Sequence, residues 1–268
     1  MRHGLPSPYE HSTLSERDIR TLVPTEPIRI RPDINLVKIG GQSILDRGRP
    51  AVYPLIDEIV ACKDEHKMIL TVGGGTRARH CYSIALELEL PTGVLAALGA
   101  STPRQNAWML QMLMAKHDAI FMVYEDIEKL PLYLRMGCLP IMTGMPPFDW
   151  WEKLPARGKG RIPPHRTDAG TFLTAEFLGA RSLIFVKDED GLYTADPKKD
   201  KDARLIPAAT VNEVLDMDLG DLIIERIVLE YLKRARNVKQ VQIVNGLKPG
   251  NLTRALAGEH VGTIIRAD

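Results

Sequence analysis

The stretch Ile34-Asn35-Leu36-Val37-Lys38-Ile39-Gly40-Gly41 decides how the chain is expected to fold. A short apolar run that stops at two glycines is typical of a buried β-strand followed by a tight turn. Residues 68–72 form a second apolar run, which stops at Gly73-Gly74-Gly75. Between these runs, residues 51–62 carry apolar side chains at helical spacing and are predicted to form a crossover helix. This order of strand, helix and strand favours a parallel sheet.

The rest of the chain continues the alternation. Further helices are predicted at residues 76–88, 102–116, 167–178 and 222–236, and further strands at 119–123, 139–142, 182–186, 240–244 and 261–265. The expected fold class is therefore α/β, with a doubly wound, mainly parallel sheet flanked by helices, in one domain spanning residues 34–268.

Two segments fall outside this pattern. Residues 1–33 contain five prolines and little apolar periodicity, so they are predicted to be an N-terminal extension, either an assembly arm or a mobile tail. Residues 144–166 are rich in proline and glycine, and a loop of this length in a compact domain is usually functional or disordered.

Composition excludes several classes of protein. The 268 residues contain 35 Lys and Arg against 34 Asp and Glu, and a net charge of +1 gives no electrostatic case for binding nucleic acid or a membrane surface. The three cysteines form no CxxC pair, no apolar run approaches the ~20 residues of a membrane span, and the first ten residues lack the apolar core of a signal peptide. The sequence thus predicts a cytoplasmic protein. The seven histidines show no zinc-ligand spacing.

Two lysines accompany the glycine-rich turns. Lys38 lies inside an apolar strand, and Lys187 follows another predicted strand. Ligands of open α/β sheets bind at the carboxyl ends of the strands, where backbone amides of a glycine turn can cradle phosphate. Neither turn has the Rossmann or Walker spacing, and two ordinary turns are the alternative. We favour a polyphosphate site, because two ammonium groups can offset the charge that develops during phosphoryl transfer.

Four motifs in sequence order resemble the amino-acid kinase superfamily, which includes uridylate, glutamate and aspartate kinases. These motifs are residues 37–41, 73–75, 167–170 and 190–197. The resemblance covers residue 34 to the C-terminus. Within the superfamily the chain is most similar to the molybdenum storage proteins, and more to their β than to their α subunits. The stretches that carry this similarity are residues 38–43, 46–49, 76–80, 144–147, 162–164, 166–170, 187–197, 244–256 and 258–263.

The resemblance implies a function. It implies binding of ATP with Mg²⁺ and a hexameric cage in which molybdate or tungstate condenses into polyoxometalate clusters while ATP is used. The hexamer is either homomeric or built with a related subunit.

The resemblance also implies residue roles. Lys38, Gly40 and Gly41 would hold the β- and γ-phosphates, Lys187 would neutralise charge near the γ-phosphate, and Asp168 would orient both lysines. The other expected nucleotide-binding residues are Gln42, Gly74, Gly75, Asp190, Gly191, Tyr193, Asp196, Pro197 and, near the base, Asn245. Physical chemistry agrees, since a carboxylate between two ammonium groups keeps both charged. Simpler interpretations are helix capping for Asp168, core packing for Tyr193 and turn formation for Asp196.

Two departures from the family keep alternatives open. Residues 102–107 lack the arginine–aspartate stretch that uridylate kinases use for the nucleoside monophosphate. Residues 148–153 lack the histidine run of the storage α subunit, so no cluster ligand is assigned in this chain. A uridylate-kinase-like phosphotransferase with a small acceptor is the alternative function. A regulatory or structural subunit that binds ATP without turnover is a third.

Overall fold

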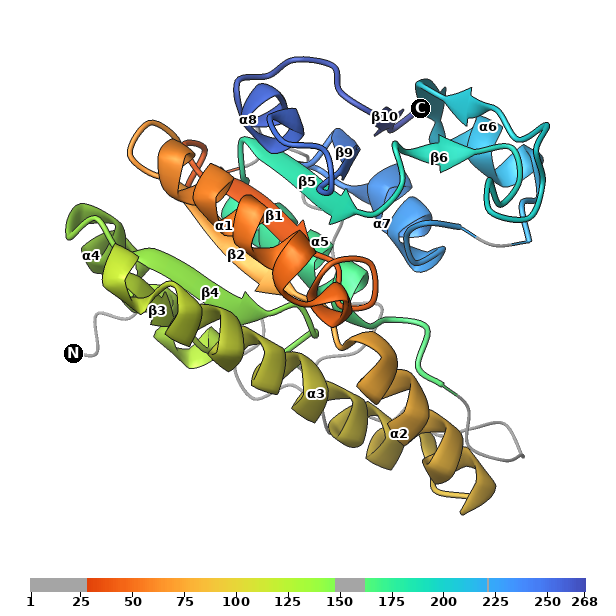
Figure 1. Ribbon diagram of the computed structural model, residues 1–268, viewed down its shortest axis with the longest axis horizontal. Coiled ribbons are helices and arrows are strands. Elements are labelled where there is room, and N and C mark those ends of the chain that lie inside the picture. Colours follow the sequence, from red (N-terminus) through yellow and green to blue (C-terminus); the bar gives the residue numbers. More distant parts are fainter. Residues whose placement is uncertain (1–27, 148–161, 221) are drawn as a thin grey trace, which may run out of the picture.

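The computed structural model describes residues 28–147, 162–220 and 222–268. Within them an eight-stranded sheet has the order β3-β4-β2-β1-β5-β9-β10-β8 (Figure 1). The strands are β1 (Asn35–Ile39), β2 (Met68–Val72), β3 (Ala119–Phe121), β4 (Leu139–Thr143), β5 (Ser182–Lys187), β8 (Ala208–Thr210), β9 (Gln240–Asn245) and β10 (Thr263–Arg266). A separate antiparallel pair consists of β6 (Leu192–Tyr193) and β7 (Leu205–Ile206).

The sheet is parallel from β3 to β9, and the only reversal among these strands is the antiparallel pairing of β9 with β10. The expected mainly parallel α/β fold is therefore confirmed. The helices are α1 (Arg49–Cys62), α2 (Gly75–Glu87), α3 (Thr92–Leu113), α4 (Leu130–Arg135), α5 (Thr167–Leu178), α6 (Val211–Asp216), α7 (Ile227–Arg234) and α8 (Asn251–Leu256). In the described ranges, every helix is too short or too polar to cross a bilayer.

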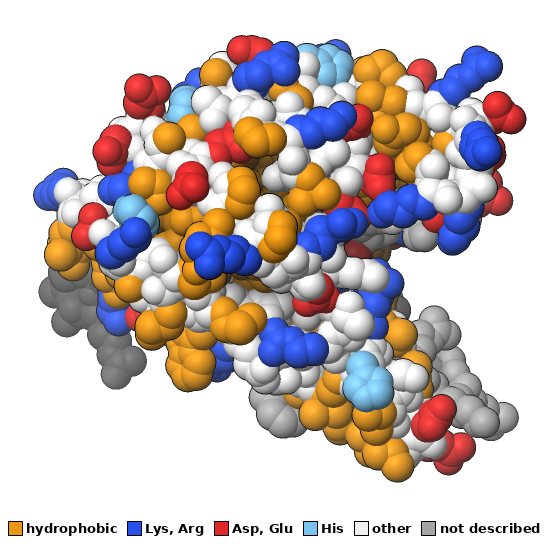
Figure 2. All heavy atoms as spheres, viewed as in Figure 1, with side chains coloured by type: hydrophobic (Ala, Val, Ile, Leu, Met, Phe, Trp, Pro, Cys, Tyr) orange, Lys and Arg blue, Asp and Glu red, His pale blue; other side chains and the backbone are white. Residues whose placement is uncertain are grey.

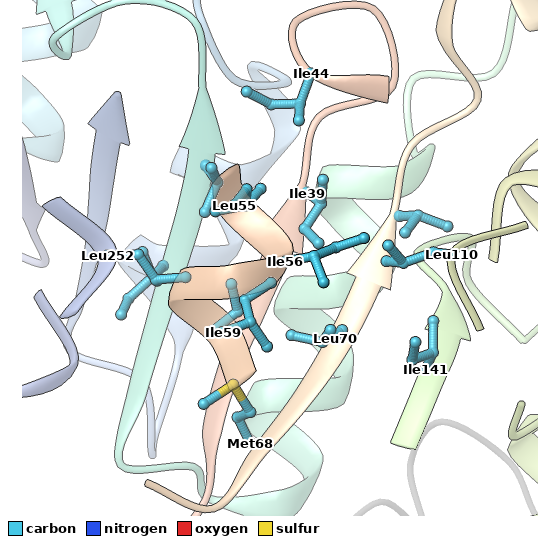
Figure 3. Packing of buried hydrophobic residues seen from close by; sticks show 14 of the residues in the cluster. Ile39, Ile44, Leu55, Ile56, Ile59, Met68, Leu70, Leu110, Ile141 and Leu252 are labelled. Atoms are coloured by element: carbon cyan, nitrogen blue, oxygen red, sulfur yellow. The ribbon is translucent and has the colours of Figure 1, made fainter. Parts of the chain in front are cut away.

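Helices cover both faces of the sheet. α1 and α8 pack on one face, where Leu55, Ile56 and Ile59 of α1 lie against strand residues such as Leu70 (Figure 3). α5 and α7 pack on the other face. Each fully buried aliphatic side chain of this size contributes about 1.5–3 kcal/mol relative to the exposed state.

Side chains of β1 alternate between the two faces of the sheet, and this alternation decides on which face Lys38 lies. Val37 and Ile39 belong to the α1 side of the core, whereas Leu36 belongs to the α5 side. Because alternate residues of a strand share a face, Lys38 also lies on the α5 side. The same alternation in β5 places Lys187 on the face of Leu183 and Phe185, again toward α5.

Two predicted helix boundaries are wrong. The helix expected at residues 102–116 begins at Thr92, so Pro103 lies inside α3 rather than in its first turn. Proline is favoured in a first turn because it lacks the backbone N–H, but here it is accommodated within the helix. The helix expected at 222–236 begins only at Ile227, and residues 222–225 instead line a cleft. Short elements such as α4, α6, α8 and β6–β8 carry too few residues for a periodic signal.

Most of the predicted extension and much of the predicted loop, residues 1–27 and 148–161, lie outside the described residues. The last part of the extension packs on the end of α5. Arg29 donates hydrogen bonds to the carbonyl oxygens of Gly179 and Ala180 at 2.9 and 2.7 Å. The Arg31 amide donates to the Leu178 carbonyl at 2.7 Å.

Candidate functional site

A cleft of about 1150 Å³ opens at the carboxyl ends of β1, β2 and β5. Figure 2 shows it as the hollow on the right side of the molecule, with Lys and Arg side chains on its rim. Loops after three strands, the start of α5 and residues 222–225 form its walls. This is the edge at which ligands of open α/β sheets bind.

A buried triad of charges lies at the bottom of the cleft. Lys38 is the last residue but one of β1, Lys187 ends β5, and Asp168 lies in the first turn of α5. The Lys38 Nζ lies 2.6 Å from Asp168 Oδ1, and the Lys187 Nζ donates to Asp168 Oδ2 at 3.0 Å. The three side chains are only 5–10% exposed. One carboxylate therefore holds both ammonium groups in fixed positions.

Burial and charge oppose each other in this triad. Burial lowers the pKa of Lys187 to about 8, although the Asp168 carboxylate acts to raise it. Burial acts to raise the pKa of Asp168, but Lys187 and Lys38 outweigh it and hold that pKa well below its usual range. Lys187 is thus a cation near neutral pH that can lose its proton at mildly alkaline pH.

The two glycine turns pack directly on each other. A Cβ on Gly41 would collide with the backbone of Gly73 and Gly75, and one on Gly73 would lie 2.7 Å from the Gly41 nitrogen and 3.3 Å from the Lys38 Nζ. Glycine is required here because the backbones approach so closely. Asp46 secures the second turn, since its Oδ2 accepts a hydrogen bond from the Thr76 amide in α2 at 2.5 Å.

The structure places most of the predicted site residues on the walls of the cleft. They are Lys38, Gly40, Gly41, Gln42, Gly74, Gly75, Asp168, Lys187, Gly191, Tyr193, Asp196 and Pro197. Asp190 and Asn245 lie outside the lining residues and bond to each other. The Asn245 Nδ2 donates to Asp190 Oδ1 at 3.0 Å, and the Lys248 Nζ donates to Asp190 Oδ2 at 2.7 Å. This contact joins the loop after β5 to the end of β9.

Ion pairs hold the loop after β5. Asp188 accepts from Arg47 at 2.6 Å and from Lys198 at 3.0 Å, and Lys198 also pairs with Glu189 at 2.9 Å. Asp196 accepts from the Lys198 amide at 2.9 Å, a turn contact made by a residue that also lines the cleft. Sequence analysis did not identify the partners in these pairs, because contacts between distant residues have no local signal.

Glu225 is the buried charged residue of the site that sequence analysis missed. Its carboxylate accepts hydrogen bonds from the amides of Arg166, Asp168 and Ala169 at 2.9–3.1 Å. The side chain of Arg166, the N-cap residue of α5, makes no capping bond, so a residue 57 positions from Asp168 caps the helix instead. Glu225 falls inside the helix wrongly predicted at residues 222–236, where it would have counted as a surface charge.

Among the residues that the structure describes, no group of three or more His, Cys, Asp or Glu side chains is placed to hold a metal ion. Arg77, which follows the second glycine turn, contacts Gln105 and Asn106 of α3. Asn106 in turn donates to the Gly73 carbonyl at 2.6 Å. Asn106 thus holds the second glycine turn through the Gly73 carbonyl.

Comparison with known proteins agrees with this arrangement. Residues 33–245 match the model of the amino acid kinase family. The chain belongs to the amino acid kinase family. Over 239 residues it is 56% identical to molybdenum storage protein subunit beta from Azotobacter vinelandii, covering 89% of this chain and 88% of that protein.

Uridylate kinases are more distant relatives of this chain. The uridylate kinase of Methanobrevibacter smithii is 28% identical over 239 residues, covering 86% of this chain and 97% of that protein. The solved uridylate kinase of Archaeoglobus fulgidus has a TM-score of 0.65 and 25% identity, covering 86% of this chain and 99% of that one. The resemblance to the amino acid kinase family and, within it, to a storage protein β subunit is therefore confirmed.

Proposed function

We propose that this chain is an ATP-binding subunit of a hexamer that stores molybdate or tungstate as polyoxometalate clusters. The observation that carries the proposal is the 56% identity to molybdenum storage protein subunit beta, which extends over 89% of this chain. The name of that relative also supports assembly with a related, non-identical subunit.

The chemistry of the cleft supports ATP as its ligand. Two buried ammonium groups converge on one carboxylate beside glycine turns that leave no space for side chains. ATP is expected to enter with Mg²⁺, its phosphates lying against Gly40, Gly41 and the two lysines. Fixed cations of this kind stabilise charge that develops on a transferring phosphoryl group. Asp168 would keep both lysines aimed at that group, and Tyr193, Asp196 and Pro197 would contact the rest of the nucleotide.

Metal uptake by the purified protein tests the proposal. The protein, alone and together with any subunit that copurifies with it, is incubated with molybdate or with tungstate, each with and without Mg-ATP. Gel filtration and elemental analysis follow. We expect many metal atoms per chain in a hexamer-sized peak, only when ATP is present, and a strong reduction in the Lys38→Ala variant. Absence of retained metal in every arm would overturn storage.

A phosphotransferase is the second candidate, favoured by one feature of the cleft. The cavity extends beyond the two lysines to Arg79, Tyr82 and Arg166, where a small acceptor could bind. ADP release that depends on uridine monophosphate or another acceptor, without metal retention, would favour this candidate over storage. Binding of ATP with neither activity would favour a regulatory or structural subunit.

A further inference from the structure

We propose that Glu225 is a positioning residue for the ATP chemistry of this cleft, acting on Asp168 through the first turn of α5 and on Lys187 through its charge. The inference deepens the proposed function and rests on it. Glu225 does not belong to any of the motifs that identify the family in this sequence, and its side chain is only 8% exposed.

Glu225 fixes the backbone that carries Asp168. The first amides of a helix have no partner within the helix and need an acceptor from outside. Glu225 Oε2 accepts from the Arg166 and Ala169 amides, and Oε1 accepts from the Asp168 amide. Three bonds to one carboxylate leave the first turn of α5 little freedom to rotate. The direction of the Asp168 side chain is set accordingly.

A bond in the opposite direction reaches the Asp168 carboxylate itself. The Glu225 amide donates to Asp168 Oδ2 at 3.2 Å, and the same oxygen accepts from the Lys187 Nζ at 3.0 Å. Residue 225 therefore holds both the backbone and the side chain of Asp168. A shift of this oxygen would move the ammonium group that is paired with it.

The charge of Glu225 acts on the same group. Burial raises the pKa of Glu225, and the neighbouring Asp168 carboxylate raises it further, whereas Arg166 and the amides lower it. Among the described residues, Glu225 interacts electrostatically with Asp168, Arg166, Lys187, Tyr82 and Tyr231, and Lys187 itself also faces Asp168 and Lys38. Two carboxylates thus face the cations of the triad, and the second helps Lys187 keep its proton.

The opposite end of α5 offers a matched control. Glu176 accepts hydrogen bonds from the backbone amides of Arg236, Asn237 and Val238 at 2.7–3.0 Å. It ties α5 to the segment before β9 with a carboxylate that also receives three amides, but it does not line the cleft. A purely structural tether would behave alike at both ends.

The experiment compares Glu225→Gln, Glu225→Asp and Glu176→Gln in the full-length protein. Melting temperature, ATP affinity by calorimetry and kcat for ATP hydrolysis are measured as a function of pH around the Lys187 pKa of about 8. We expect Glu225→Gln to lower kcat about tenfold while ATP affinity at neutral pH changes less than about threefold. The alkaline limb of its profile should move to lower pH, because a nearby negative charge is lost.

The control variants separate position from charge. Glu225→Asp keeps the charge on a shorter side chain, so the limb should stay in place while kcat still falls. If Glu225→Gln does not fold, Glu225→Asp tests the inference by itself. An unchanged kcat in Glu225→Asp would then contradict the inference. Glu176→Gln should lose stability with an unchanged kcat and profile.

Equal behaviour of Glu225→Gln and Glu176→Gln, with no movement of the limb, would overturn the inference and leave the proposed function intact. If the wild-type protein binds ATP without hydrolysing it, the pH dependence of ATP affinity is measured in place of that of kcat. An alkaline limb at the same pH in Glu225→Gln and wild type would then overturn the inference. Failure of the wild-type protein to bind ATP overturns the proposed function and, with it, the role of Glu225.

Discussion

The two walls of the cleft are built from different interactions. The glycine wall, residues 40–47 and 73–79, consists of backbone packed against backbone, and side chains are excluded where the two turns meet. The ionic wall, residues 188–199, is held by exposed pairs such as Lys198 with Asp188 and Glu189. The lysine–aspartate triad lies buried between them.

This difference indicates how each wall tolerates change. Close-packed backbone cannot accept even one added carbon without moving, whereas an exposed ion pair is worth about 0–1 kcal/mol and can be replaced by water. The glycine wall is therefore expected to set the shape of the phosphate site. The ionic wall should adjust to the nucleotide. The following predictions test that contrast, from the largest effect to the smallest.

Loss of either lysine between the walls should have the largest effect. We expect Lys38→Ala and Lys187→Ala each to lower ATP hydrolysis by about 100-fold or more, since each removes a fixed cation aimed at phosphate. Asp168 keeps one partner in each variant, so the circular dichroism spectrum should stay normal. Lys116→Ala, an exposed lysine outside the cleft, is the control. Unchanged ATP affinity and hydrolysis in both variants would refute the assignment of the site.

An added methyl group should damage the glycine wall. Gly41→Ala places a Cβ against the backbone of Gly75 and Gly73 and should lower the free energy of unfolding by about 1–3 kcal/mol, together with ATP affinity. Among the residues that the structure describes, a Cβ on Gly220 would have no neighbour within 4 Å, so Gly220→Ala should change neither quantity. Urea denaturation and calorimetry measure both. Equal stability of the two variants would remove the distinction between the walls.

The buried lysine predicts a dependence of stability on pH. The pKa of Lys187 falls from 10.5 to about 8 on folding, so between these values the unfolded chain binds a proton that the folded chain has lost. Stability contributed by this residue must then rise with pH, by at most about 1.4 kcal/mol per pH unit. Urea denaturation of wild type and Lys187→Met across that range should show the difference growing with pH. A constant difference would mean that Lys187 stays protonated.

Substitutions in the ionic wall should change the free energy of unfolding least. Lys198 is 58% exposed, and Lys198→Ala should lower the free energy of unfolding by less than about 1 kcal/mol. Added salt should reduce the difference from wild type further, because it screens exposed charges. Thermal melts at low and high salt provide the measurement. A loss as large as that of Gly41→Ala would show that the two walls are equally rigid.

Local patterns predicted much of the fold. The strands at Lys38 and Lys187 and the helix at residues 167–178 have apolar runs of the right length and clear stops, so their predicted bounds agree with the structure within about one residue. Such patterns fail for the long α3, whose predicted start at residue 102 is wrong. Pro103 has the residue type that is common in a first helical turn, but it lies inside the helix. A proline signals a boundary only on average, and the packing around it decides.

The residues of the candidate site fall into two groups, those that a local motif identifies and those that depend on contacts between distant parts of the chain. Lys38, Asp168 and the glycine turns lie in motifs that are contiguous in sequence, so sequence alone could single them out. Glu225 and the Arg47–Asp188 pair depend on contacts across 57 and 141 positions. No local pattern encodes such contacts, which follow only from the path of the chain. The predicted nucleotide roles of Asp190 and Asn245 stay predictions, with a mutual hydrogen bond as their observed contact.

If the cleft binds ATP as proposed, the Arg47–Asp188 pair has a consequence for the kinetics of nucleotide exchange. It is the contact at 2.6 Å by which a residue of the glycine wall reaches the ionic wall. Arg47 is 43% exposed and Asp188 16%, and Asp188 keeps Lys198 as a second partner, so separating the walls at this contact costs little free energy. Exchange should then be limited by release of the phosphates from the buried lysines rather than by opening at this contact. A nucleotide held in this way dissociates slowly even from an open entrance.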